Sequence, residues 1–308
     1  MRSGPGDPAV RTRPYNRAPM KIRKAVVTAA GPAQRELPLQ RLVDRDGTAK
    51  TALRLLLDEA TAAGIGEIAV VVHADDRVRY AEAAGAPGPR LQFIAQPAPR
   101  GYADALLQAR DFIGDESFLH LVGDHLFLPR GTTRPAAELV AAAEREGAAV
   151  SAVQATREAH LPQFGAVGGP RVAGAERLFT IDAVLEKPTP TEAEQKLFVP
   201  GLRAGHYLCF FGLHVLPAAL FEPLERAVRE AADPSRVSLT QALATLPGRA
   251  KWLALEVAAT RFDLGEKYGL LIAQLALALA GSDRDDVLAQ VTELLLAREK
   301  ARAAGDGA

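Results

Sequence analysis

Two aspartates that lie far apart in the sequence each follow an apolar segment and could share a metal ion. Asp124 comes just after the apolar run 118–122, and Asp263 comes shortly after the apolar run 252–257. Open α/β sheets bind their ligands at the carboxyl ends of their strands. Two carboxylates at that edge can hold one hard cation against a polyphosphate. The alternative for Asp263 is that it caps the N-terminus of the helix that follows it.

Two loops could contact a nucleotide. The first apolar segment, 24–30, runs into Gly31, and a glycine turn after the first strand is a common place for backbone N–H groups to bind phosphate. The amide of Gln96 can donate and accept at once, which suits the edge of a pyrimidine. Gly101, five residues later, lets a flat ring approach the backbone. The alternative for the Gln96 loop is a rigid turn between a strand and a helix.

The elements that must position these residues alternate along the first half of the chain. Apolar strand segments alternate with segments in which apolar residues recur at helical spacing, a pattern that predicts βαβ units and a parallel sheet. The strands are apolar throughout, as expected when helices cover both faces of a sheet. We predict strands at 24–30, 67–73, 91–95 and 117–122, and helices at 51–63 and 102–112.

The second half of the chain is less regular. Residues 165–172 and 177–184 predict a hairpin or a meander. The remaining segments predict strands at 148–154, 207–213 and 252–257 and helices at 136–146, 191–198, 218–232 and 239–246. From Glu266 onward the pattern is helical, with a break at Gly281-Ser282. The predicted fold is an α/β, Rossmann-like, mostly parallel central sheet with a small β insertion and C-terminal helices.

The sequence pattern divides the chain into three segments. Residues 1–20 carry four arginines and four prolines with few large aliphatic residues, which predicts a disordered basic tail, or alternatively an arm that binds nucleic acid. We expect residues 21–266 to form a catalytic domain, since they contain both aspartates and both candidate nucleotide loops. Residues 267–308 form a helical segment that is a candidate oligomer contact, so a homo-oligomer (dimer or tetramer) is expected.

Composition limits the partners. The 308-residue chain has a formal net charge of zero, so no global field favours nucleic acid or membranes. No apolar run reaches the roughly 20 residues that span a bilayer. The single cysteine, Cys209, excludes an internal disulfide and a cysteine-rich zinc site. We therefore expect a cytoplasmic protein with neither nucleic-acid nor membrane partners.

Five short motifs occur in an order that resembles a known family. They are Gln96–Ala105, Gly123–Phe127, Phe164–Val167, Leu185–Pro188 and Arg261–Gly265. Together they resemble the sugar-1-phosphate nucleotidyltransferases, most closely the bacterial UTP–glucose-1-phosphate uridylyltransferases, and are also similar to glucose-1-phosphate thymidylyltransferases. The resemblance covers roughly residues 21–269 and implies the nucleotide-diphospho-sugar transferase type of sheet.

The resemblance assigns roles to individual residues. It implies that Asp124 and Asp263 hold Mg²⁺, and that Arg35 and Lys187 act beside them as cations on phosphate. The implied nucleotide-binding residues are Ala29, Ala30, Gly31, Gln96, Gly101 and Gly123, and the implied sugar-binding residues are Gly165, Glu186 and Tyr207. The alternative for Glu186 and Lys187 is a solvated charge pair.

The first phosphate loop departs from the family pattern G-x-G-T-R and is followed by a shortened segment. Ala33 replaces the second glycine, Gln34 replaces the threonine, and Pro32 removes an N–H that could bind phosphate. Arg35 is retained, but the usual loop lysine is not, and Arg41 and Lys50 are the candidates to replace it.

Two functions from different classes remain open. The first is Mg²⁺-dependent transfer of a nucleotidyl group from a pyrimidine nucleoside triphosphate, UTP above all, to a hexose 1-phosphate such as glucose 1-phosphate, which gives an NDP-sugar and pyrophosphate. The second is a catalytically degenerate regulatory protein that binds a nucleotide sugar. The retained aspartates favour the enzyme, and the altered loop favours the regulator.

Overall fold

The computed structural model describes residues 20–32, 34–85, 88–98, 100–245 and 251–305. Apart from Met20, the predicted basic tail lies outside the described residues. The helices are α1 Ala52–Ala62, α2 Arg77–Ala84, α3 Tyr102–Leu107, α4 Arg110–Ile113, α5 Pro135–Glu146, α6 Pro190–Lys196, α7 Phe221–Glu230, α8 Leu239–Leu243, α9 Gly269–Leu279 and α10 Arg284–Gly305. The strands are β1 Lys24–Thr28, β2 Arg41–Val43, β3 Ala49–Thr51, β4 Glu67–His73, β5 Arg90–Gln96, β6 Phe118–Val122, β7 His125–Pro129, β8 Ala149–Arg157, β9 Gly165–Gly168, β10 Leu178–Thr180, β11 Ala183–Glu186, β12 His206–Leu216, β13 Trp252–Glu256 and β14 Ala259–Asp263.

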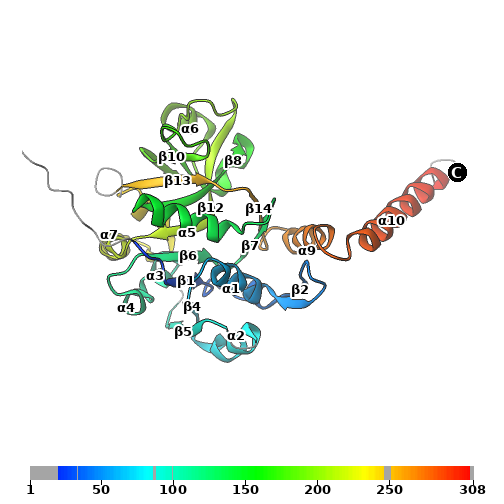
Figure 1. Cartoon of the computed structure of the whole chain (residues 1–308), viewed down its shortest axis with the longest axis horizontal. Coiled ribbons are helices and arrows are strands. Elements are labelled where there is room, and N and C mark those ends of the chain that lie inside the picture. The colour runs from blue at the N-terminus through cyan, green and yellow to red at the C-terminus, as the bar shows by residue number, and fades with distance from the viewer. Residues whose placement is uncertain (1–19, 33, 86–87, 99, 246–250, 306–308) are drawn as a thin grey trace, which may run out of the picture.

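A central sheet runs through the molecule in the order β10-β13-β8-β12-β6-β1-β4-β5 (Figure 1). Strands β6, β1, β4 and β5 are parallel, and β13 is parallel to β8, whereas β12 is antiparallel to both of its neighbours. Strands β9 and β11 branch from β12 and form the small β insertion. The predicted α/β fold with a mostly parallel central sheet is confirmed.

Strand β1 shows why the sheet has helices on both faces. Ala25 and Val27 pack into one core cluster with α1 and α5, while Val26 packs into a second cluster with α3, α7 and α8. Successive strand side chains point to opposite faces of a sheet, so an uninterrupted apolar run is what a doubly covered strand requires. The carboxyl end of β1 is thereby fixed between β4 and β6, next to the loop that begins at Ala29.

Several sequence-based boundaries needed correction. The single helix predicted over 102–112 is two short helices separated by a turn at Gln108 and Ala109, and Ala109 and Ile113 are both buried in the second core cluster. Strand β11 rather than β10 pairs with β9, and β10 pairs with β13. Strands β7 and β14 were not predicted, and they form a two-stranded antiparallel ribbon.

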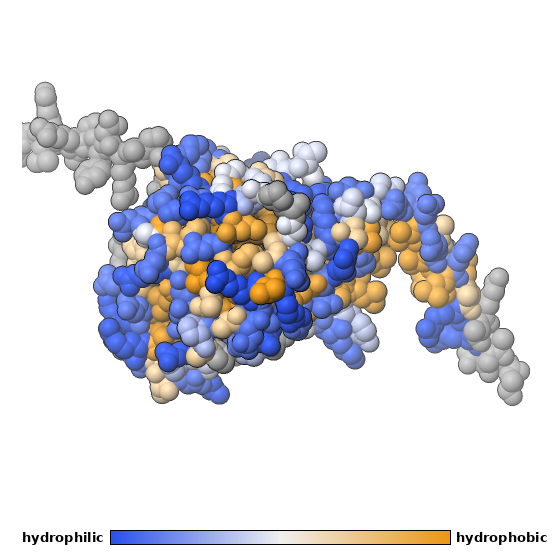
Figure 2. Space-filling view, turned by 90° about the horizontal axis from the view of Figure 1, so that it is seen from below, coloured by the Kyte–Doolittle hydropathy of each residue, from blue (hydrophilic) through white to orange (hydrophobic). Residues whose placement is uncertain are grey.

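The C-terminal helices differ from each other. Ala273 and Leu277 of α9 are buried in the main core, whereas α10 projects away from the body of the molecule (Figure 1). Apolar side chains are exposed on this projecting arm, as Figure 2 shows; among them are Leu288, Leu294, Leu295 and Leu296. In the part of the chain that the structure describes, no helix is both long and apolar enough to cross a membrane.

Candidate active site

A cavity of about 470 Å³ opens at the carboxyl ends of β1 and β6. Its wall brings together all six residues that the sequence assigned to nucleotide binding, together with Asp124. These six are Ala29, Ala30, Gly31, Gln96, Gly101 and Gly123. The edge of the sheet therefore collects residues from three separate segments, 28–38, 96–105 and 122–125, into one site, as expected for an open α/β sheet.

Gly123 allows the two central strand ends to approach each other closely. Its N–H donates to the carbonyl oxygen of Thr28 at 2.9 Å. A Cβ at this position would lie 2.6 Å from that oxygen and 3.0 Å from the Cβ of Ala29. A side chain here would push β1 and β6 apart and would move Asp124, the next residue.

The amide of Gln96 is held in one orientation. Its nitrogen donates to the carbonyl oxygen of Gly101 at 3.1 Å and to the Asp104 carboxylate at 2.7 Å. Both partners can only accept, so the nitrogen must face them and the side-chain oxygen remains free to accept from a ligand. Gly101 itself has φ of +91°, and a Cβ there would lie 2.5 Å from the backbone oxygen of Ser235. Glycine is thus required at this position for both conformation and space.

Asp124 and Asp263 lie together although 139 positions separate them. Asp263 ends β14, and its partner across the β7–β14 ribbon is His125, the neighbour of Asp124. The N–H of Leu264 donates to the backbone oxygen of Asp124 at 2.8 Å, which ties the two motifs directly. One ligand atom each from Asp124, His125 and Asp263 lie within 4.8 Å of one another. The residues present therefore fit a divalent cation, because carboxylate oxygens at this spacing are its usual ligands.

Asp263 does not cap a helix. Its Oδ1 accepts from the N–H of Gly265 at 2.8 Å, and α9 begins only at Gly269. The carboxylate is therefore oriented by a tight turn that follows the strand. The N-cap alternative for this residue is wrong.

The charged and polar groups around Asp124 keep its carboxyl group ionised. Burial opposes ionisation, but the hydrogen bond from His125 and the charge of Arg261 outweigh it, so the pKa of Asp124 lies below its usual value. Arg261 lies two residues before Asp263 on the same face of β14. Its guanidinium donates to the backbone oxygen of Phe210 at 2.5 Å and lies 3.9 Å from the ring centre of Phe164.

A second cavity, of about 260 Å³, adjoins the first. Tyr102, Val122 and His125 line both cavities. Its wall contains the predicted sugar-binding residues Gly165 and Glu186, and a Cβ at Gly165 would lie 2.7 Å from the hydroxyl of Thr240. The two cavities thus meet beside the pair of aspartates.

A buried polar network lies beneath the group formed by Asp124, His125 and Asp263. His120 is fully buried, within 3.3 Å of the Thr28 hydroxyl and 3.1 Å of the Tyr102 hydroxyl. His214 stacks against it with ring centres 6.0 Å apart, and its Nδ1 lies 2.8 Å from the hydroxyl of Ser151. Burial lowers the pKa of His214 to about 3, so this ring is neutral at physiological pH. The network fixes Tyr102 at the boundary between the two cavities.

Four of the predicted site residues line neither cavity. One is Asp263, which lies beside Asp124; the other three are Arg35, Lys187 and Tyr207. Arg35 lies 3.3 Å from the buried carboxylate of Asp76, and its N–H closes a turn on the carbonyl oxygen of Gly31 at 2.8 Å. Lys187 is exposed and has φ of +47°, the one positive value among the described residues other than glycine. Tyr207 packs on the small third core cluster beside Cys209 instead of facing the sugar cavity.

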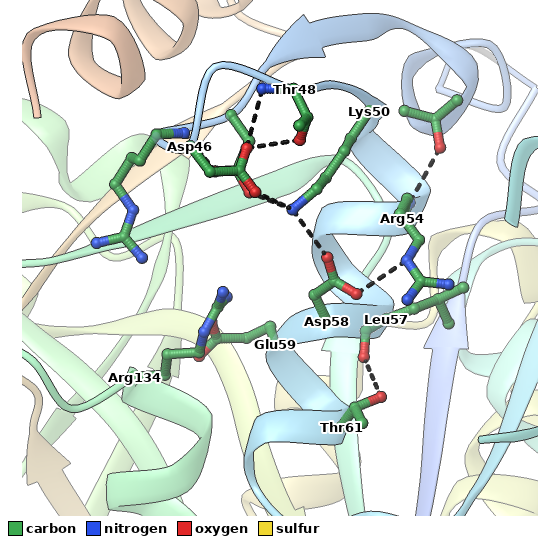
Figure 3. A network of polar contacts seen from close by, with 12 residues as sticks. Asp46, Thr48, Lys50, Arg54, Leu57, Asp58, Glu59, Thr61 and Arg134 are labelled. Carbon is green, nitrogen blue, oxygen red and sulfur yellow. Dashed lines mark hydrogen bonds and ion pairs between the residues drawn. The ribbon is translucent and has the colours of Figure 1, made fainter. Parts of the chain in front are cut away.

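Neither candidate for the missing loop lysine reaches the cavity. Lys50 is held by three carboxylates, Asp44 at 2.6 Å, Asp46 at 3.3 Å and Asp58 at 3.4 Å, in the network of Figure 3. Arg41 is exposed on β2, paired with Thr51 of β3. Among the described residues that line the first cavity, none is a lysine or an arginine.

Three residues of the site were missed by the sequence reasoning. His125 and Arg261 stand inside motifs that were read only for their aspartates, and Tyr102 begins the helix after the Gln96 loop. The i, i+2 spacing of Arg261 and Asp263 was a usable signal, because it places both on one face of a strand. His120 and Ser151 gave no comparable signal, since each is a lone polar residue in an apolar run.

Comparison with known proteins agrees with this geometry. The sequence profile of the nucleotidyl transferase family matches residues 24–242, which is more than half of the chain. The chain belongs to this family. The resemblance found from five short motifs is thereby confirmed, and the protein is a nucleotidyltransferase.

Individual relatives agree with the family match. The UTP–glucose-1-phosphate uridylyltransferase 2 of Streptococcus pyogenes serotype M3 is 28% identical over 310 residues, which cover 92% of this chain and 99% of that protein. A solved UDP-glucose pyrophosphorylase in complex with UDP-glucose matches with a TM-score of 0.68 at 20% identity, covering 83% of this chain and 98% of that one. A UTP-bound UGPase from Acinetobacter baumannii matches with a TM-score of 0.68 at 23% identity, covering 89% and 99%. At these identities the structural likeness shows the shared fold.

Proposed function

We propose that this nucleotidyltransferase transfers UMP from UTP to glucose 1-phosphate in a Mg²⁺-dependent reaction that releases UDP-glucose and pyrophosphate. The observation that carries the proposal is the position of Asp124 and Asp263 where the nucleotide cavity meets the second cavity. The curated relative of Streptococcus pyogenes bears the name of this activity. A pair of carboxylates between two substrate cavities is what an attack of one phosphate on another requires.

The reaction needs no nucleophilic side chain. An oxygen of the sugar phosphate attacks the α-phosphorus of UTP, a new P–O bond forms, and the bond to the departing pyrophosphate breaks. Both substrates are anions, so their mutual repulsion and the developing charge make up much of the barrier. A divalent cation held by Asp124 and Asp263 would supply the positive charge that offsets both.

The protein's own groups position the substrates. Holding two reactants in line can contribute on the order of 7–11 kcal/mol, provided that the reacting groups stay oriented. Among the described residues that line the two cavities, Arg261 is the one arginine or lysine; it lines the second cavity, and its charge stabilises the ionised form of Asp124. Arg35 and Lys187 would have to turn toward the cavity to meet a phosphate, as their exposure of 30% for Arg35 and the exposed position of Lys187 permit.

The fixed amide of Gln96 favours uracil and thymine over cytosine. Because its nitrogen is engaged by Gly101 and Asp104, the group that it offers to a base is the carbonyl oxygen, an acceptor. Uracil and thymine present an N3–H donor, whereas N3 of cytosine is itself an acceptor. The second cavity offers Glu186, Gln163 and Thr240, which suit the hydroxyl groups of a hexose.

A regulatory protein that binds a nucleotide sugar without turnover is the second candidate. It is favoured by the first cavity, whose described wall contains no lysine or arginine, and by the pairing of Arg35 with Asp76. Binding alone does not require two metal-binding carboxylates, which favours the enzyme.

Pyrophosphate release with a panel of substrates distinguishes the two candidates. The full chain is incubated with Mg²⁺, glucose 1-phosphate and, one at a time, UTP, dTTP, CTP, ATP and GTP. We expect release with UTP, weaker release with dTTP and little with CTP. No release with any nucleotide or with other sugar 1-phosphates, together with tight UDP-glucose binding, would establish the regulatory alternative.

We also propose that the chain forms a homo-oligomer through its C-terminal arm. Helix α10 touches mainly α9 of its own chain and leaves Leu294, Leu295 and Leu296 more than half exposed (Figure 2). A second copy that packs on this helix would remove these side chains from water, at roughly 25 cal/mol per Å² of apolar surface. Light scattering should give a mass of at least a dimer for the full chain, and Leu295→Glu should lower it. A monomer at micromolar concentration would rule the proposal out.

A further inference from the structure

The histidine beside the metal-binding aspartates is placed by three independent features of the fold. His125 faces Asp263 directly across the β7–β14 ribbon, so their side chains leave the same face of the ribbon. It follows Asp124 in sequence, and its Nδ1 lies 2.8 Å from Asp124 Oδ1. Its side chain is 13% exposed and lines both cavities.

Strand β12 packs a glycine beside this ring. The pairing register of β12 with β8 shifts between Phe210 and His214, and Gly212 lies inside this irregular segment with φ of +84°. A Cβ at Gly212 would lie 3.4 Å from Cδ2 of His125 and 2.7 Å from a methyl carbon of Val122. The positive φ and the close approach to Val122 therefore require glycine at this position, and the backbone of Gly212 packs beside the imidazole.

The distances suit direct coordination. Two neighbouring ligands on an octahedral ion at about 2.1 Å are separated by about 3.0 Å. The 2.8 Å between Asp124 Oδ1 and His125 Nδ1 is close to that edge, and one ligand atom from each of Asp124, His125 and Asp263 lie within 4.8 Å of one another. A cation can thus replace the proton that the imidazole shares with the carboxylate.

We propose that His125 is a third protein ligand of the cation, through Nδ1, and that it makes the site selective for metals that bind nitrogen. This inference rests on the proposed cation site at Asp124 and Asp263. Imidazole suits later transition metals such as Co²⁺, whereas Mg²⁺ prefers oxygen ligands. The ligand set of two carboxylates and one imidazole raises the affinity for Co²⁺ far more than the affinity for Mg²⁺.

Calorimetric titration of the full chain with Co²⁺ alone and with Mg²⁺ alone tests this selectivity. Asn is close to His in polarity but offers no imidazole nitrogen, so His125→Asn should weaken Co²⁺ binding by at least about tenfold, the loss that even an outer-shell substitution causes. Its Mg²⁺ affinity should change by less than about threefold. The matched control is His160→Asn, which removes an exposed histidine outside both cavities and should leave both affinities unchanged. Equal Co²⁺ affinity in wild type and His125→Asn would overturn the proposal.

A second measurement needs no variant. Electron spin echo spectra of the wild-type chain with less than one equivalent of Mn²⁺ should show modulation from a directly bound imidazole nitrogen. Mn²⁺ that binds without nitrogen modulation would overturn the role of His125 while leaving the two-aspartate site intact. If Co²⁺, Mg²⁺ and Mn²⁺ all failed to bind the free protein, both the role of His125 and the two-aspartate cation site would be contradicted.

Discussion

The two ends of the nucleotide cavity are built in different ways. At the metal end, Asp124 and Asp263 are fixed by a strand ribbon and by a backbone hydrogen bond of 2.8 Å between Leu264 and Asp124. At the phosphate-loop end, the N–H of Arg35 donates to the carbonyl oxygen of Gly31 at 2.8 Å, and the guanidinium of Arg35 is paired with the buried carboxylate of Asp76 at 3.3 Å. At the metal end, Asp124 lines the first cavity and Arg261 lines the second, whereas the loop end presents backbone and uncharged side chains to the first cavity.

This difference separates what must be held rigidly from what can move on binding. Carboxylates that share a cation are useful only at fixed separation, and neighbouring strands provide that separation without a ligand. A triphosphate carries its own charge and can draw Arg35 away from Asp76, since the Arg35 side chain is 30% exposed and the buried Asp76 keeps a second cation, Arg79, at 3.2 Å. We therefore expect changes at the metal end to affect turnover more than changes at the loop end do.

The largest effect is expected from Asp124→Asn. Loss of one of two cation-binding carboxylates should lower kcat by at least about a hundredfold, comparable to removal of one preorganised electrostatic group. The isosteric amide should leave the free energy of unfolding within about 1 kcal/mol of wild type. Steady-state kinetics and chemical unfolding measure the two quantities, and Asp115→Asn, in an exposed turn, is the control. Wild-type turnover in Asp124→Asn would remove this residue from the mechanism.

A smaller effect is expected from acid, through the histidines beneath the metal end. Burial lowers the pKa of His214 to about 3, while an unfolded histidine has a pKa of about 6.5. Between these values the unfolded chain binds the extra proton, so stability is present above pH 6.5 and is lost as the pH falls. His214 alone should cost about 2 kcal/mol between pH 8 and pH 5. His214→Gln should show a smaller loss over that range, and an identical pH profile would show that this ring is not the group that titrates.

The smallest effect is expected from Arg35→Ala at the loop end. If this side chain turns to the phosphates only in the complex, its loss should lower kcat/KM for UTP by about tenfold, the value of one charge-assisted hydrogen bond. The effect should appear in KM more than in kcat, because ground-state and transition-state phosphates are both contacted. Asp76→Asn, which frees Arg35, should not weaken UTP binding. If Arg35→Ala lowered turnover as much as Asp124→Asn does, the expected difference between the two ends would be contradicted.

Much of this site could be read from local patterns. An apolar run followed by Gly123 and Asp124 predicts a strand that delivers a carboxylate, and the structure brings that residue to the cavity together with all six predicted nucleotide-binding residues. Such predictions succeed because a strand and the loop after it are set by short-range sequence. The metal-binding and catalytic roles of these residues remain predictions.

Other features depend on contacts that a single sequence does not reveal. The pairing of Arg35 with Asp76 joins a loop to a separate helical turn, and His125 meets Asp263 through the pairing of two strands that lie far apart in the sequence. Tyr207 was assigned to the sugar through the resemblance, but its strand turns it toward Leu161 and Cys209. Lys50 could not be placed from sequence because its three acidic partners come from two different elements.

The most direct test of the central claim follows the two products at once. Phosphorus NMR of the wild-type chain with Mg²⁺, UTP and glucose 1-phosphate should show UDP-glucose and pyrophosphate appearing at equal rates, and neither should appear at a comparable rate with Asp124→Asn. Unchanged UTP and glucose 1-phosphate after prolonged incubation with folded wild-type protein would contradict the account.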